Sequence, residues 1–153
     1  MEDVRHARET LLRDGYHSTT LLLDGEHGTI VYVYTGELIT PAQFAHAGRR
    51  LAQEIGARVG RVRNLTLVSE VWITLAVDRA RLGDDAPRTE GLLIAARAQA
   101  HGSTEFIRLY PLIRDIDGTI TGFGPDGSAQ PGIYPPVDAF LRAYHDALPH
   151  SAN

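Results

Sequence analysis

One carboxylate stands in the middle of an apolar stretch and is the residue of this chain best placed to do chemistry. Glu70 lies between Val68 and Trp72 in a segment that otherwise reads as a buried strand. A carboxylate is costly to bury unless a cation neutralises it, so we expect Glu70 to have an arginine partner. The fifteen basic residues of the chain are all arginine, which makes lysine unavailable for this role.

Two arginines are predicted to lie on one face of the sheet. A strand pair that closes Gln99 against Thr104 places Arg97 diagonal to Arg108, and Glu70 would complete the cluster if it shares their face. One interpretation is an anion-binding or acid/base site in which the pKa of Glu70 is tuned. The other is a satisfied structural ion pair, which we favour.

Histidines offer the remaining candidates for proton transfer. His17 and His101 are the candidate acid or base beside Glu70 if the site is an enzyme. The seven histidines include no HxH or HExxH pair, so the spacing predicts no metal site, and we expect no cofactor.

The residue types that the chain lacks exclude several familiar chemistries. Without lysine or cysteine there is no phosphate-loop lysine, no Schiff base, no thiol nucleophile and no cysteine-ligated zinc. No serine stands in a GxSxG elbow. The composition therefore favours a protein that binds over one that catalyses.

The sequence Asp115-Ile116-Asp117-Gly118-Thr119 resembles the nucleophile loop of haloacid-dehalogenase-like phosphotransferases. The resemblance implies a nucleophilic and an acid aspartate beside a magnesium ion. However, Arg114 interrupts the preceding strand, and no lysine exists to hold the phosphate. Since Asp-Gly between two strands is a strong hairpin signal, we predict a tight turn here.

Charge and composition limit the partners and the compartment. A net charge of -4 opposes nucleic-acid binding, which needs a basic face. We expect a soluble, cytoplasmic protein, because the N-terminus is too polar for a signal peptide, no apolar run could span a membrane, and there is no cysteine for disulfides. A nucleic-acid adaptor ranks last among our hypotheses and would use Arg49, Arg50, Arg58, Arg61 and Arg63.

Hydrophobic periodicity and turn residues predict the elements that position these side chains. Thr40-Pro41-Ala42-Gln43 combines an N-cap, a first-turn proline and a capping-box glutamine, so it opens the clearest helix. Residues 77–90 are expected to form a long loop. We predict helices at 3–14, from 41 onward and at 136–148, and strands at 19–23, 29–34, 64–75, 91–99, 104–113 and 119–123.

These elements predict a single α+β domain over residues 1–153. Its antiparallel sheet has five or six strands, its three helices complete the order αββαββββα, and the last four strands form a meander. The order is similar to that of profilin-like and roadblock-like modules, which are mainly interaction domains.

Short segments resemble small uncharacterised bacterial proteins in which a strand with a Glu-x-Trp element precedes a Pro/Arg/Glu loop and another strand. The likeness is carried by Val68-Ser69-Glu70-Val71-Trp72 and by Pro87-Arg88-Thr89-Glu90-Gly91-Leu92, after Leu11-Leu12-Arg13-Asp14-Gly15 and Leu23-Asp24-Gly25-Glu26. The resemblance implies no known activity. It implies that Glu70, Trp72, Arg88 and Glu90 belong to one structural unit.

Our leading functional hypothesis is a cytoplasmic, non-catalytic binding or assembly module that recognises a protein partner or itself. An exposed strand edge would allow it to form a homodimer. Tyrosines that gather near Trp72 would favour such an interface. The alternative is a small hydrolase or anion-binding enzyme that uses Glu70 with Arg97 or Arg108.

Overall fold

A computed structural model describes residues 2–14, 18–34, 38, 40–73, 80–86, 89–98, 104–124, 127–131 and 134–149. Three helices of more than two turns alternate with seven strands and one short 3-10 helix. The helices are α1 (Glu2–Asp14), α2 (Pro41–Val59) and α4 (Pro135–Ala147), with η1 at Gly83–Asp85. The strands are β1 (Thr19–Gly25), β2 (Thr29–Tyr34), β3 (Val62–Ile73), β4 (Thr89–Ala98), β5 (Thr104–Arg114), β6 (Ile120–Phe123) and β7 (Gly127–Pro131).

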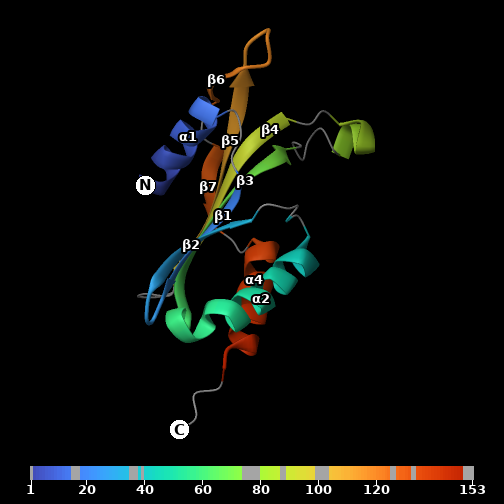
Figure 1. The fold of residues 1–153 in the computed structure, drawn as a ribbon. Coiled ribbons are helices and arrows are strands. Elements are labelled where there is room, and N and C mark those ends of the chain that lie inside the picture. The colour runs from blue at the N-terminus through green and yellow to red at the C-terminus, as the bar shows by residue number, and fades with distance from the viewer. Residues whose placement is uncertain are drawn as a thin grey trace.

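The strands form one antiparallel sheet in the order β2-β1-β3-β4-β5-β6, and β7 also pairs with β5. The predicted α+β class and the meander β3-β4-β5-β6 are therefore confirmed. The sheet is long and twisted, with α2 and α4 together near one end and α1 and the β5–β6 hairpin near the other (Figure 1).

Strict alternation along the strands produces an apolar core on each face of the sheet. Leu21, Leu67 and Ala95 are opposed across β1, β3 and β4, and they pack on the face covered by α2 and α4. Val68 and Ile94 point to the other face, where the buried Leu11 of α1 joins them. The two cores lie on opposite sides of one continuous sheet.

The first core is closed by a close approach of α2 to α4. A Cβ atom added to Gly48 would lie 2.4 Å from the carbonyl oxygen of Phe140. Phe140 and Tyr144 are stacked on α4, with ring centroids 6.2 Å apart, and both are fully buried. Because no side chain separates the two backbones at Gly48, the helices pack at a distance that only glycine permits.

Three polar contacts attach α4 to β3, to the turn before it and to β4. The Tyr144 hydroxyl donates to the Gly60 carbonyl oxygen at 2.8 Å, where α2 leads into β3. The backbone N–H of Val62 donates to Nε2 of His145 at 3.2 Å. Arg97 on β4 donates to Asp138 at 3.1 Å. The last helix is thus attached to two strands and to the turn before β3.

The predicted helices and the α2 cap are confirmed. The Thr40 hydroxyl accepts from the Gln43 N–H at 3.2 Å, and the Gln43 side chain accepts from the Thr40 N–H at 2.9 Å, which is the expected capping box. On the last helix, Val137, Phe140, Leu141 and Tyr144 are buried, so its apolar residues face the core at helical spacing.

The expectation of a loop at 77–90 is wrong, and one strand lies outside those that we predicted. Residues 77–90 do not form one continuous loop, because 83–85 form η1 and β4 already begins at Thr89. Residues 127–131, which the glycine- and proline-rich sequence presents as irregular, form β7 and pair with β5. Glycine and proline at its ends mask its strand character in the sequence.

We expect Gly48→Ala to destabilise the protein by about 1–3 kcal/mol, because the new methyl group meets backbone and not a side chain that can rotate away. Chemical denaturation of the purified protein measures this change in the free energy of unfolding. Gly122→Ala is the control, since a Cβ atom there meets nothing within 4 Å. Equal stability of the two variants would disprove the close approach.

We also expect His145 to make stability depend on pH. Burial, and then the charges of Arg61 and Arg97, lower the pKa of His145 below its ordinary value of 6.5. The unfolded chain therefore binds a proton first as the pH falls, so this contribution is complete above about pH 6.5 and is lost below it. Protonation would also remove the acceptor for the Val62 N–H, worth about 1 kcal/mol.

Denaturation at pH 7.5 and 5.5 tests this expectation. His145→Gln should reduce the difference in the free energy of unfolding between the two values, because an amide oxygen accepts a hydrogen bond and does not titrate in this range. His46→Gln, on the exposed side of α2, should leave the difference as in the unchanged protein. A His145→Gln protein with unchanged pH dependence would exclude His145 as the responsible group.

Candidate functional site

The predicted cluster of Glu70 with both arginines does not form. Ala98, and not Gln99, is opposite Thr104, so Arg97 is opposite Glu105 and Arg108 is opposite Ile94. A shift of one residue moves a side chain to the other face of the sheet. Arg97 therefore lies on the face of α2 and α4, whereas Arg108 lies with Glu70 on the α1 face.

Arg97 is engaged with the last helix. Its guanidinium forms an ion pair with Asp138 at 3.1 Å, and both side chains are about one quarter exposed or less. Asp138 also contacts Arg142, one helical turn further along α4, at 2.9 Å. The arrangement holds α4 on the sheet, and it replaces the anion-binding role that we considered for Arg97.

Glu70 is exposed, which contradicts the expectation of a buried carboxylate. It is opposite Leu92, and its charge contributes to raising the pKa of Arg114 at the end of β5. Val68, two residues earlier, is buried, so the apolar cover of this face ends between the two positions. The cost of burial that made Glu70 a candidate therefore does not arise.

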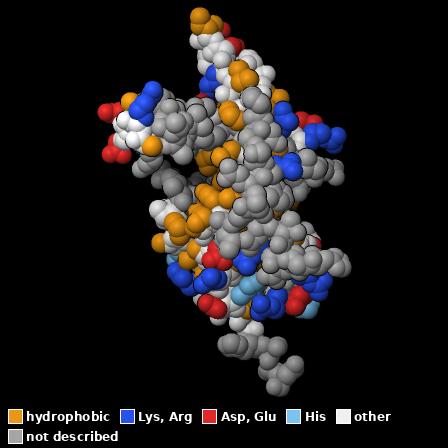
Figure 2. Space-filling model, turned by 180° about the vertical axis from the view of Figure 1, so that it is seen from behind, with side chains coloured by type: hydrophobic (Ala, Val, Ile, Leu, Met, Phe, Trp, Pro, Cys, Tyr) orange, Lys and Arg blue, Asp and Glu red, His pale blue; other side chains and the backbone are white. Residues whose placement is uncertain are grey.

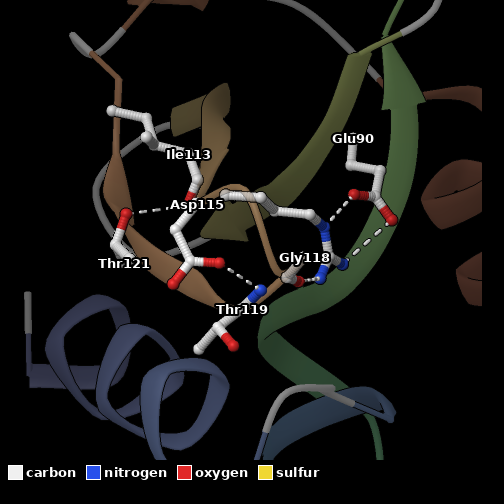
Figure 3. A network of polar contacts seen from close by, with 7 residues as sticks. Glu90, Ile113, Asp115, Gly118, Thr119 and Thr121 are labelled. Carbon is white, nitrogen blue, oxygen red and sulfur yellow. Dashed lines mark hydrogen bonds and ion pairs between the residues drawn. The ribbon is translucent and has the colours of Figure 1, made fainter.

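The charged groups of this end of the sheet meet in a network around Arg114 (Figure 3). Its guanidinium forms a two-pronged contact with the carboxylate of Glu90, in which one bond measures 3.0 Å, and donates to the Gly118 carbonyl oxygen at 2.6 Å. Hydrogen bonding to Glu90 is the main cause that raises the pKa of Arg114. Arg114 thus connects β4 to the β5–β6 turn.

The Asp115-Ile116-Asp117-Gly118 segment is the predicted tight turn. Asp115 accepts hydrogen bonds from the N–H groups of Asp117, at 2.9 Å, and Thr119, at 3.0 Å. Gly118 has a φ of 82°, the left-handed conformation that glycine adopts most easily. The carboxylate that would be a nucleophile is thus occupied by the backbone of its own turn (Figure 3).

The described residues contain no group of three His, Asp or Glu side chains placed to hold a metal ion. The candidate bases His17 and His101, together with Arg88, lie outside the described residues. Glu90 and Trp72 are opposite one another on β4 and β3, next to Glu70. Since Arg88 and the side chain of Trp72 are not described, the expected unit of these four residues stays a prediction. Of these residues, Glu90 holds Arg114 and so links β4 to β5.

The edge formed by β2 presents a different kind of site. Val31 and Val33 are 61% and 50% exposed, whereas the alternate residues Ile30, Tyr32 and Tyr34 pack against the first core. The strand Thr-Ile-Val-Tyr-Val-Tyr has no charge and no proline. Among the described residues, β2 pairs with β1 on one side and with no strand on the other.

The opposite edge is built differently. β5 is covered there by two short strands, β6 with four residues and β7 with five, and β7 ends in a proline. Short strands and proline obstruct the pairing of an edge with another chain. The β2 edge lacks both features, so it is the edge that can accept a further strand.

Arginines do not define a nucleic-acid surface on the face seen from behind, because Arg side chains there are interspersed with Asp and Glu (Figure 2). Arg50 itself is paired with Glu54 at 3.5 Å. Among the described residues, no helix is both long and apolar enough to cross a membrane.

Sequence reasoning missed two features that the structure makes important. His145 was one of seven histidines without a motif, and only its distance to Val62 distinguishes it. The β2 edge was predicted as a strand, but strand order, which decides that it is an edge, depends on pairing between distant segments. The alternation of two valines with residues that are partly buried, Ile30, Tyr32 and Tyr34, was the available signal.

The two aspartates of the β5–β6 turn should differ in effect. Asp115→Ala removes the acceptor of two backbone N–H groups, so amide hydrogen exchange at Asp117 and Thr119 should accelerate about fivefold, the change that corresponds to about 1 kcal/mol. Asp117→Ala should leave the exchange rate of the Thr119 amide unchanged, because the Asp115 carboxylate accepts the hydrogen bond from Thr119. Equal acceleration in both variants would contradict this description of the turn.

The chain was compared with known proteins in three ways. No family model, no curated protein and no solved structure matches it.

Proposed function

We propose that the protein is a non-catalytic assembly module that associates with itself through the edge of β2. The observation that carries the proposal is the pair of exposed valines, Val31 and Val33, on an uncharged and proline-free edge strand. Such an edge offers unpaired backbone groups and apolar side chains together, which is the combination that strand addition uses.

The chemistry of the other candidate residues supports a binding role. Arg97 is engaged with Asp138, Arg114 with Glu90, and Asp115 with the turn that it begins. Each of these groups stabilises the scaffold, and the described residues contain no cluster that would hold a catalytic metal. These contacts stabilise the scaffold, while the β2 edge with its two exposed valines is left for association.

We further propose that this assembly acts in the cytoplasm, and that the protein is bacterial. The absence of cysteine is compatible with a reducing compartment. The exclusive use of arginine as the basic residue, with abundant alanine and glycine, supports a source with a GC-rich genome.

Sedimentation velocity over a range of protein concentrations tests the proposal. The unchanged protein should sediment as a dimer at tens of micromolar, an order-of-magnitude expectation for a modest interface. Val31→Lys should weaken self-association at least tenfold, because a charge at the edge opposes strand pairing. Circular dichroism checks that the variant keeps its fold.

Ile116→Lys is the matched control, since it places the same charge at a fully exposed apolar residue of the β5–β6 turn. This hairpin lies at the other end of the sheet from β2 (Figure 1). It should associate like the unchanged protein. A monomer at all concentrations, or equal weakening by both substitutions, would overturn the proposed function.

A further inference from the structure

The geometry of β2 also restricts how two copies can meet, and this inference rests on the proposed self-association. In an antiparallel pair, residues directly opposite one another point to the same face of the sheet. Ile30, Tyr32 and Tyr34 point to the face of α2 and α4, whereas Val31 and Val33 point to the other. Copies that keep these faces continuous must therefore place odd-numbered residues opposite odd-numbered ones and even opposite even.

Of the registers that obey this rule, the one centred on Tyr32 pairs all five apolar residues of β2, whereas the one centred on Val33 pairs only the last three. With Tyr32 opposite Tyr32 of the second copy, Val31 is opposite Val33 and Ile30 is opposite Tyr34. Centring the pair on Val31 would instead set Thr29 against Val33, although the Thr29 hydroxyl already donates to Asp24 at 3.0 Å. Cross-strand pairs of aromatic and β-branched residues stabilise a sheet, which favours the register centred on Tyr32.

Charges beside the strand support the same arrangement. Arg50 and Glu54 form an ion pair along the exposed side of α2, at 3.5 Å, with both side chains more than half exposed. Tyr32 packs against the core to which Leu51 and Ile55 of α2 belong. Burial raises the pKa of its hydroxyl, and the charges of Arg50 and Glu54 act on it too, so the pair lies on the part of α2 nearest to Tyr32. In the arrangement that we propose, a twofold axis at Tyr32 sets α2 antiparallel to its copy, with Arg50 facing Glu54 of the second copy.

We infer that the protein forms a twofold symmetric dimer in which two β2 strands join antiparallel about Tyr32, with the Arg50–Glu54 pairs complementing one another across the axis. The two sheets become one continuous sheet with both α2–α4 layers on the same side. Four valines, two from each copy, then form one apolar stripe on the opposite side. The partner that this surface binds is a second copy of the chain.

Single cysteine substitutions test the register directly, because the chain has no cysteine of its own. Residues opposite themselves across the axis have Cα atoms about 4.5–5.5 Å apart, within the range that a disulfide bridges. Tyr32→Cys should therefore yield a covalent dimer under mild oxidation. Val31→Cys and Val33→Cys should not, because a shift of two residues along the strand separates their symmetry mates by more than about 7 Å.

Charge reversal tests whether the Arg50–Glu54 pairs complement one another across the axis, and mixing the two variants supplies the control. Arg50→Glu alone and Glu54→Arg alone each set like charges against one another across the axis, so each should self-associate at least fivefold more weakly than the unchanged protein. An equimolar mixture should form heterodimers and recover the lost affinity, since the acidic pair of one variant then meets the basic pair of the other. The pair within each helix stays mismatched in the mixture, so recovery reports on the interface.

The outcomes separate this inference from the proposed function. A covalent dimer of the Tyr32→Cys variant, together with recovery in the mixture, supports both. Disulfide formation in the Val31→Cys or Val33→Cys variant instead, or no recovery in the mixture, would overturn the Tyr32-centred dimer, while loss of association in Val31→Lys would still support assembly through β2. An unchanged protein that is monomeric at every concentration would overturn both.

Discussion

The contact between α2 and α4 at Gly48 is the constraint on which the rest of the fold depends. With a Cβ position only 2.4 Å from the Phe140 carbonyl oxygen, the two helices form one dense layer over the sheet. A wider separation would move Phe140 and Tyr144 out of the core that they fill. Protein interiors have little spare volume, so the position of α4, and every contact made from it, follows from this one approach.

The same layer determines which charged groups are left for function. On α4, Asp138 contacts Arg97, and His145 accepts a hydrogen bond from the Val62 N–H. These polar groups therefore attach α4 to the sheet. On α2, which shares a core with Tyr32, the exposed Arg50–Glu54 pair stays at the surface. The polar groups of α4 are thus used in contacts within the chain. The exposed pair on α2 is left for the assembly that we propose through β2.

Local signals in the sequence were sufficient for the helices, for six of the strands and for the β5–β6 turn, because caps, periodicity and Asp-Gly act over a few residues. They were insufficient for the cluster of Glu70, Arg97 and Arg108. That cluster depended on the β4–β5 register, and pairing Ala98 with Thr104 in place of Gln99 moves Arg97 to the other face. Register is decided by core packing across the whole sheet, and no single turn residue reveals it.

The two edges of the sheet differ in how well they are protected, and this difference supports the assembly that we propose. Natural sheets protect their edges with short strands, proline or charge, and the β6 and β7 side has the first two of these. β2 keeps six residues without charge or proline, and two of its valines are at least half exposed. An unprotected edge of this kind favours aggregation unless it pairs in a defined way. In the dimer that we propose, its alternating faces and the flanking Arg50–Glu54 pair provide that definition, because they match a second copy in one orientation and mismatch it in the flipped one.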